Sequence, residues 1–505
     1  MKTIKLYSQI LGSFLLLSTF TSCKKNFLNL NPLDAISSGT FWKTSSDAEL
    51  GLAGCYQRLQ ADLFGYSRYC YTGLTDEAYH QYDYYGVSDM LVGELAPTSQ
   101  LPSTIWSDSY AGISSCNIFL QNIGNVQMDA TQKGIDIGEV HFLRAFFYFE
   151  LVNIFGDVPM FTTPPTATEA LSVVRTSKDT VLNLIYNDLD SAIAVLPDVS
   201  FNGHAVKGSA LALEARVYLY NQQWSQCAAL CQQVIQSGTF SLYPNYAGQF
   251  FAKNQPNSGM IFATDYLAPN DLQGDYGGLD IELGWWASLV PYQSMVNEYF
   301  MNNGKPITDP TSGYNPNNPY LNRDPRLLMS IKTPAQVWHN PDGSVFTTDN
   351  TIPPYYQVIK YVDTTLLPIN YGDVNKENED YILIRYADVL LMYAEATNEA
   401  TGPDPSVYAV INQVLARAGM PPVNQAEYST QSTLRDYIRH ERKVEFAFEG
   451  LRYFDLLRWK IADQVLPTVV TPGGVNGVFP VSHYLMPIPQ SEINLNSKLT
   501  QNPGY

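Results

Sequence analysis

The chain has 505 residues, of which 45% are hydrophobic and only 15% are charged. This composition excludes an intrinsically disordered chain, and the length allows a large hydrophobic core. The formal net charge of −18 argues against a nucleic-acid partner, because binding to a phosphate backbone requires clustered Lys and Arg. The 35 tyrosines outnumber the 23 phenylalanines. Tyrosine can both stack on a ligand and hydrogen-bond to it, so the composition favours a binding surface.

The N-terminus has the pattern of an export signal. Two lysines precede an apolar stretch at 10–17, which is too short to span a bilayer, and small polar residues lead to Cys23. We therefore predict a signal peptide over 1–22. The Thr-Ser-Cys sequence that ends at Cys23 resembles a bacterial lipobox, which makes Cys23 the predicted lipidation site and 23–40 a lipidated tether. An ordinary secretory signal with an incidental cysteine is the alternative.

The remaining cysteines give no sign of a disulfide framework or a metal site. Their number is odd, and neither a CxxC pair nor a Cys/His cluster with zinc spacing occurs in the chain. We expect Cys227 and Cys231 to be small buried packing residues, and we expect no metal and no cofactor. The five positions are Cys55, Cys70, Cys116, Cys227 and Cys231.

Apolar residues recur at helical spacing along much of the chain. The segments concerned are 143–154, 180–197, 208–221, 224–237, 386–400, 407–418 and 434–449. The pair 208–221 and 224–237 is separated by two glutamines and carries small residues on its apolar faces, which is typical of a tetratricopeptide hairpin. The sequence therefore predicts a mainly α fold of tetratricopeptide-like helical hairpins that form a single α-superhelical body with loop-rich insertions and a few short strands.

The composition divides the mature chain into three regions. We expect an N-terminal helical region at 41–240 and a C-terminal helical region at 381–505, both within one compact unit that spans 23–505. Between them, 241–380 is rich in Pro, Gly, Asn and Tyr. So long a segment cannot be structureless inside a compact domain, so we predict short strands around 260–264 and 356–361. This loop-rich region is the expected ligand-binding region.

Several stretches are specific enough to indicate a family. The sequence IRYADVLLMYAEA at 384–396, IRHERKVEFAFEG at 438–450, and the closing segments LMPIP at 485–489 and QNPGY at 501–505 resemble the SusD/RagB family. The helical segment 208–220 is similar to the repeat helices of that family. The resemblance covers essentially the whole mature chain.

The resemblance implies a cell-envelope lipoprotein of the Bacteroidetes type that is not an enzyme. Such a protein is lipid-anchored in the outer membrane, binds oligosaccharide or polysaccharide nutrient, and sits as a lid on a SusC-like TonB-dependent transporter. We expect it at the cell surface. Export to the surface commonly accompanies acidic residues after the lipidated cysteine, whereas Lys24 and Lys25 follow it here, so a periplasmic orientation stays open.

The sequence contains none of the familiar catalytic motifs, such as GxSxG, GxxxxGK[ST] or HExxH. Glu441 and Glu445 lie among arginines at helical spacing, which predicts charge pairing along the flanks of the helix and keeps both carboxylates ionised rather than poised for catalysis. Two alternatives remain: a secreted helical glycoside hydrolase, whose two acids need no local motif, and a SusD-like binder of a peptide ligand.

Two loop segments combine flat aromatic rings with polar side chains, which is what a sugar needs for its apolar face and its hydroxyl rim. The first segment spans 76–86, and the second spans 270–278 and leads to a Trp-Trp pair. Arg68 and Arg323 are local cations that could recognise an acidic sugar. The predicted ligand-binding residues are Gln81, Tyr82, Asp83, Tyr84, Tyr85, Asp275, Tyr276, Trp285 and Trp286.

Overall fold

The computed structural model describes residues 41–267, 278–340, 342–363, 365 and 378–505. The predictions made for Cys23, Asp275 and Tyr276 lie outside these residues. In the described part of the chain no helix is long and apolar enough to cross a membrane.

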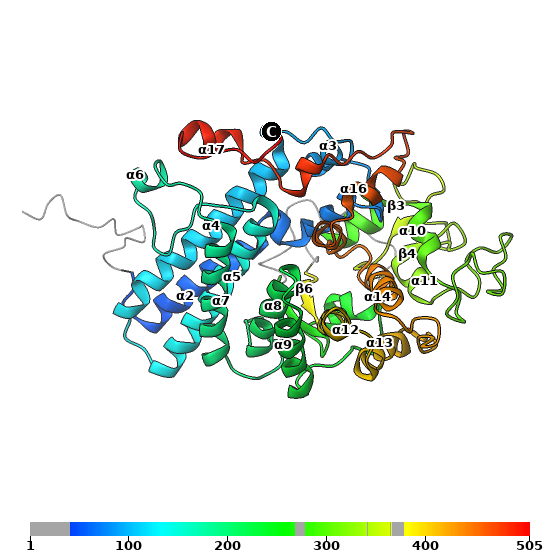
Figure 1. The fold of residues 1–505 in the computed structure, drawn as a ribbon, viewed down its shortest axis with the longest axis horizontal. Coiled ribbons are helices and arrows are strands. Elements are labelled where there is room, and N and C mark those ends of the chain that lie inside the picture. The colour runs from blue at the N-terminus through cyan, green and yellow to red at the C-terminus, as the bar shows by residue number, and fades with distance from the viewer. Residues whose placement is uncertain (1–40, 268–277, 341, 364, 366–377) are drawn as a thin grey trace, which may run out of the picture.

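An array of helices forms the N-terminal part of the molecule (Figure 1). Each long helix packs against the next one along the chain, α4 on α5, α5 on α7, α7 on α8 and α8 on α9. The hairpin predicted at 208–221 and 224–237 is confirmed as α8 and α9. The helices are α2 (Ser45–Tyr56), α3 (Val87–Leu91), α4 (Gln100–Asn122), α5 (Ala130–Phe155), α6 (Ala167–Ala170), α7 (Lys178–Val195), α8 (Lys207–Tyr220) and α9 (Trp224–Ser237).

Caps and small residues explain why these helices begin and meet where they do. Asp129 accepts hydrogen bonds from the first turn of α5, and Ser177 caps α7 in the same way. Where α4 crosses α5, Gly112 lies under the ring of Phe147, and a Cβ added there would come within 2.5 Å of a ring carbon. Close packing of these two helices therefore requires a residue without a side chain at Gly112.

The C-terminal helices continue the array, because α12 packs on α8 and α9 and also on α13 and α14. The end of α14 differs from the prediction. Helix α14 ends at Glu445 rather than Glu449, since Phe448 and Gly450 both have positive φ angles, of 67° and 74°, and turn the chain. The helices are α12 (Tyr386–Thr401), α13 (Pro405–Ala418), α14 (Gln431–Glu445), α15 (Arg452–Arg458), α16 (Ala462–Val465) and α17 (Gln490–Leu495).

Within the residues that the structure describes, the strands form three short antiparallel pairs. They join β1 (Ala78–His80) to β3 (Leu289–Pro291), β2 (Met260–Thr264) to β6 (Tyr381–Arg385), and β4 (Ile331–Lys332) to β5 (Gln357–Val358). The strands predicted around 260–264 and 356–361 are thus present. Short helices α10 (Gln293–Glu298) and α11 (Arg326–Ser330) and a π-helical turn at Asp280–Trp285 fill the same region.

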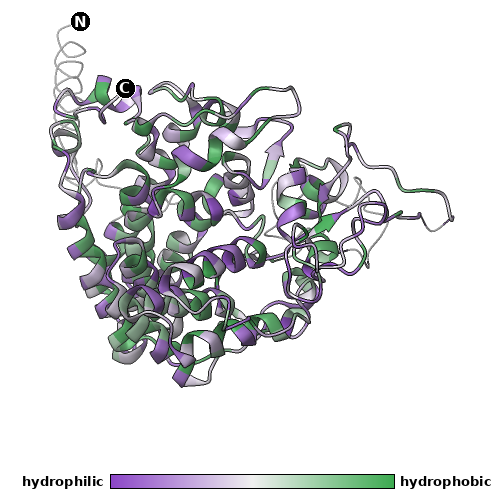
Figure 2. Ribbon diagram, turned by 45° about the vertical axis from the view of Figure 1, so that its right-hand side comes forward, coloured by the Kyte–Doolittle hydropathy of each residue, from purple (hydrophilic) through white to green (hydrophobic). Residues whose placement is uncertain are grey.

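Hydrophobic and hydrophilic residues alternate on most of the helices, as amphipathic packing requires (Figure 2). The buried apolar residues form a core that runs from the N-terminal helices to the C-terminal segments. The five cysteines between positions 55 and 231 are all buried, and the burial predicted for Cys227 and Cys231 is confirmed. The structure is therefore mainly α, with the irregular region inserted between two helical parts.

Candidate functional site

The strand pair β1–β3 places the first segment predicted for the ligand, 76–86, beside the Trp285–Trp286 pair to which the second predicted segment leads. His80 lies opposite Leu289, and the pairing continues when Gln81 N donates to Ser288 O at 3.0 Å. The Gln81 side-chain amide then donates to Trp286 O at 2.5 Å. Residues more than 200 positions apart in the sequence thus become direct neighbours.

Tyr82 is the most accessible aromatic residue of the first loop, with 38% of its surface exposed. Its hydroxyl donates to Asp349 Oδ2 at 2.7 Å. The Tyr82 ring stacks near that of Tyr84, with 6.0 Å between centroids, and meets Trp286 edge-on at 6.3 Å. We call Gln81, Tyr82, Tyr84, Trp285, Trp286 and Asp349 the aromatic platform.

The backbone of the first loop is held in an unusual conformation. Asp83, Tyr85 and Gly86 all have positive φ angles, of 50°, 61° and 69°. Asp83 Oδ1 accepts a hydrogen bond of 2.7 Å from Ser88 N, and the Tyr85 hydroxyl donates to Asp62 Oδ1 at 2.9 Å. These hydrogen bonds of Asp83 and Tyr85 fix the loop, and Tyr82 is exposed.

The buried carboxylate of Glu282 helps to hold the platform in position. Glu282 Oε2 accepts hydrogen bonds from the hydroxyls of Ser288, at 2.6 Å, and Tyr69, at 3.0 Å. Burial raises the pKa of Glu282. Because Glu282 belongs to the π-helical turn that carries Trp285, these bonds fix the position of that tryptophan.

The segment around Asp349 packs against Trp285 of the platform, and the sequence interpretation did not identify it. Asp349 N donates to Trp285 O at 2.9 Å, and the ring of Phe346 lies 5.6 Å from that of Trp285. Phe346 N in turn donates to Trp338 O at 2.8 Å. The sequence signal that could have identified this segment is a pair of aromatic residues, Trp338 and Phe346, that flank an Asp-Gly turn. Asp349 follows shortly after this turn.

The two arginines proposed as local cations do not reach the platform. Arg68 is 3% exposed and pairs with Glu150 at 2.9 Å. Arg323 is 6% exposed and donates to backbone carbonyls, among them Val296 O at 2.7 Å. Both guanidinium groups are engaged within the fold, so the sequence-based suggestion that they contact a ligand is wrong.

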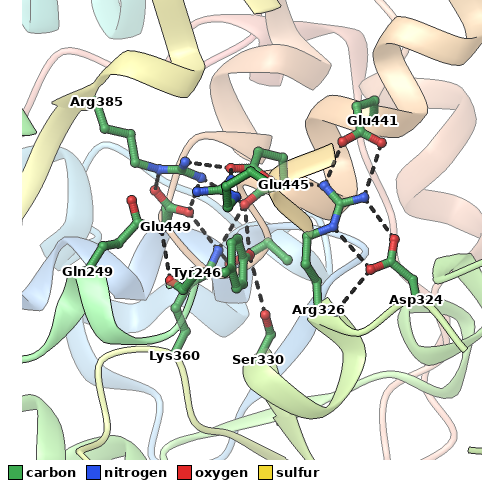
Figure 3. Close-up of polar contacts among 12 residues, drawn as sticks. Tyr246, Gln249, Asp324, Arg326, Ser330, Lys360, Arg385, Glu441, Glu445 and Glu449 are labelled. Atoms are coloured by element: carbon green, nitrogen blue, oxygen red, sulfur yellow. Dashed lines mark hydrogen bonds and ion pairs between the residues drawn. The ribbon is translucent and has the colours of Figure 1, made fainter. Parts of the chain in front are cut away.

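The charged motif on α14 lies in a buried network rather than at a binding site (Figure 3). Arg326 pairs with Glu441 at 2.5 Å and with Glu445 at 2.9 Å. Arg385 pairs with Glu445 at 2.6 Å and with Glu449 at 2.7 Å. The predicted pairing along the flanks of one helix is therefore wrong, because the partners come from distant segments.

The lack of solvent access excludes Glu441 as a catalytic acid. Burial raises the pKa of Glu441 to about 7, in spite of the neighbouring Arg326. Both of its oxygens nonetheless bond to that guanidinium, and Glu441 is only 1% exposed. A substrate has no route to this carboxylate, so the motif is structural.

Three comparisons relate the chain to known proteins. The family model described as "SusD family" matches residues 248–505, just over half of the chain. A second model, "Starch-binding associating with outer membrane", matches residues 38–219. The chain therefore belongs to the SusD family.

Individual relatives extend this similarity to nearly the full length. SusD-like protein P25 of Formosa agariphila is 27% identical, over 99% of this chain and all of its own length. The crystal structure of a SusD-like carbohydrate-binding protein from Bacteroides fragilis has a TM-score of 0.80 and 28% identity, covering 91% of this chain and 100% of that one. A laminarin-binding SusD-like protein has a TM-score of 0.72 and 26% identity, covering 92% and 100%.

Within the described residues, no group of three or more His, Cys, Asp or Glu side chains could hold a metal ion. The platform presents aromatic faces, carboxylate and amide oxygens, and backbone carbonyls.

Proposed function

We propose that the protein binds oligosaccharide or polysaccharide nutrient at the aromatic platform and passes it to a SusC-like TonB-dependent transporter of the outer membrane. The observation that carries the proposal is the convergence of Tyr82, Trp286 and Asp349 from three distant segments on one surface. Family membership and the carbohydrate-binding names of the relatives support it.

The chemistry of a sugar fits this arrangement. The apolar C–H face of a pyranose can pack on the rings of Tyr82 and the tryptophans, while its hydroxyls need neighbouring acceptors and donors. Asp349, which is exposed, supplies carboxylate oxygens beside the Tyr82 ring, and Gln81 supplies an amide. Asp275 and Tyr276, in the segment that precedes Trp285, remain part of the proposed site.

We also propose that binding occurs without cleavage. Incubation with a glycan panel that includes laminarin should show retardation in affinity electrophoresis and no increase in reducing ends. Cleavage of any glycan that binds would support the alternative of a helical glycoside hydrolase. If no glycan is retarded and a peptide mixture binds instead, the ligand class of the proposal would be wrong.

We further propose that acyl chains on Cys23 attach the protein to the outer membrane at the cell surface. Cys23→Ala should abolish labelling with a fatty-acid probe and move the protein into the soluble fraction, since each buried CH₂ of an acyl chain contributes roughly 0.8 kcal/mol of membrane affinity. Mild detergent extraction of wild-type membranes should retain a TonB-dependent barrel with the protein. Unchanged labelling of the variant would contradict the anchor, and protection from protease on whole cells would contradict surface exposure.

A further inference from the structure

Exposed aromatic side chains are rare in the part of the chain that the structure describes. Among its Phe, Tyr and Trp residues, only Tyr82, at 38%, and Tyr355, at 53%, are exposed. Tyr82 belongs to the aromatic platform, whereas Tyr355 does not. Both are nonetheless connected to Asp349. The Tyr82 hydroxyl donates to Asp349 Oδ2 at 2.7 Å, and Tyr355 follows Asp349 by six residues along the chain.

The loop between Asp349 and Tyr355 is folded back on itself. A fully extended chain would place the two Cα atoms at most about 22 Å apart. The Asn350 side chain shortens this path, because its Nδ2 donates to Tyr356 O at 2.7 Å and its Oδ1 accepts a hydrogen bond of 3.0 Å from Ile352 N. Tyr355 N donates to Ile352 O at 2.8 Å. Tyr355 is therefore held within reach of a glycan chain that passes Asp349.

Both ends of this loop are bonded to elements that also carry the platform. At the first end, Asp349 N donates to Trp285 O at 2.9 Å. At the second end, Tyr356 is 2% exposed, and its hydroxyl donates to Gln293 Oε1 at 2.8 Å and lies 3.0 Å from the Tyr320 hydroxyl. Gln293 begins α10, which follows strand β3 closely. The position of the loop relative to the platform is thus fixed.

Tyr355 has a strained backbone and an uncommitted side chain. Its φ angle is 65°, which a bulky residue adopts only under constraint. Within the described residues, its hydroxyl forms no hydrogen bond and its ring meets no other aromatic ring. Backbone strain of this kind persists only where the surrounding structure enforces it, and it is concentrated at functional positions such as ligand clamps. Here the strained turn presents an aromatic ring to solvent.

We propose that Tyr355 is a second stacking position for the glycan, outside the aromatic platform, and that the site therefore binds a chain of several sugars more tightly than a disaccharide. This inference rests on the proposed function. The rings of Tyr82 and Tyr355 would pack on different sugars of one chain, and the Asp349 carboxylate would accept hydroxyls of the sugars that connect them. Because the loop is already bonded in place, little freedom is lost on binding.

Calorimetric titration of the full chain with laminarihexaose, laminaribiose, maltohexaose and maltose tests the extension. The wild type should bind at least one hexasaccharide, about tenfold or more tightly than the disaccharide of the same series. Tyr355→Ala should weaken hexasaccharide binding by about five- to tenfold, as expected for an aromatic anchor, and leave disaccharide binding within about twofold. Tyr82→Ala should weaken the binding of both lengths.

Two further variants serve as controls. Tyr355→Phe keeps the ring and should retain hexasaccharide affinity within about threefold, since stacking needs only the ring. Leu171→Ala alters a residue that is 52% exposed at the end of α6, which Figure 1 places at the opposite end of the molecule from β3, and should change neither affinity. Circular dichroism should show every variant folded, because the substituted side chains are exposed.

The outcomes separate this inference from the proposed function. If Tyr82→Ala weakens hexasaccharide binding while Tyr355→Ala behaves like Leu171→Ala, the second stacking position is wrong and the proposed function stands. Equal weakening of hexasaccharide and disaccharide by Tyr355→Ala would overturn the preference for longer chains. Failure of the wild type to bind either hexasaccharide would overturn the inference and also count against the proposed function.

Discussion

Glu445→Gln is expected to lower the free energy of unfolding by about 3–5 kcal/mol, the usual cost of breaking a buried ion pair by removing one partner. Glu445 is fully buried and pairs with three arginines, Arg326, Arg385 and Arg417. The glutamine keeps the shape of the side chain but leaves these guanidinium groups short of one counter-charge. Urea unfolding followed by circular dichroism measures the loss.

Glu399→Gln is the matched control for this prediction. Glu399 pairs with Arg435 at 2.5 Å, but the Arg435 side chain is 28% exposed, so water can replace the lost interaction. The expected cost is below about 1 kcal/mol. An equal loss in the two variants would contradict the view that burial makes the Glu445 network important.

The same network makes the fold sensitive to acid. Although burial opposes ionisation, Arg417, Arg385 and Arg326 hold the pKa of Glu445 well below its usual value of 4.5. A carboxylate with a lowered folded-state pKa stabilises the protein above its unfolded-state pKa and loses this contribution as the pH falls. Stability should therefore decrease below about pH 4.5, and less steeply in Glu445→Gln than in the wild type.

Local patterns in the sequence were sufficient for the long helices from α7 onward, whereas α2, α4 and the first half of α5 were not predicted as separate segments. The hairpin of α8 and α9 could be predicted because apolar periodicity and small residues act within one short segment. The end of α14 could not. The residues after Glu445 continue the apolar pattern of a helix, but Phe448 and Gly450 turn the chain against Arg68, where a Cβ on Gly450 would lie 2.8 Å from the Arg68 carbonyl oxygen. That contact depends on tertiary packing.

The candidate site could likewise be predicted from the sequence only in part. The density of tyrosines around Tyr82 and the Trp285–Trp286 pair marked two segments of the platform, because polar aromatic loops are unusual in a core. The signal near Asp349, an Asp-Gly turn between two aromatic residues, was weaker, since a single aspartate in a loop is common. The role of Asp349 follows only from its hydrogen bonds to Tyr82 and Trp285, which depend on how distant segments meet.

The net charge of the platform also depended on the fold. From the sequence, Arg68 and Arg323 could have bound an acidic sugar. In the structure, Arg68 forms a buried ion pair with Glu150, and Arg323 donates to buried backbone carbonyls. The exposed charges next to Tyr82 include the carboxylates of Asp83 and Asp349. A neutral glycan is therefore the ligand that this arrangement favours over a uronic or sulfated one.

Tyr82→Ala and Trp285→Ala are each expected to weaken glycan binding roughly five- to thirty-fold, because a well-packed aromatic anchor contributes about 1–2 kcal/mol. Tyr82 is part exposed, so its loss should leave the melting temperature nearly unchanged. Trp285 packs on Phe346 and requires a check of folding by circular dichroism. Affinity electrophoresis with the glycan that the wild type binds measures both effects.

Tyr82→Phe separates the two contributions of this tyrosine. The variant keeps the ring but loses the hydroxyl that donates to Asp349 at 2.7 Å. If stacking dominates, its affinity should stay within about threefold of the wild type, since one hydrogen bond of this kind contributes roughly 0.5–1.5 kcal/mol. If Tyr82→Ala and Trp285→Ala fold normally and both keep full affinity, the aromatic platform is not where the glycan binds. The segment that contains Asp275 and Tyr276 would then become the first place to test, because it is the predicted ligand segment that these two substitutions leave unchanged.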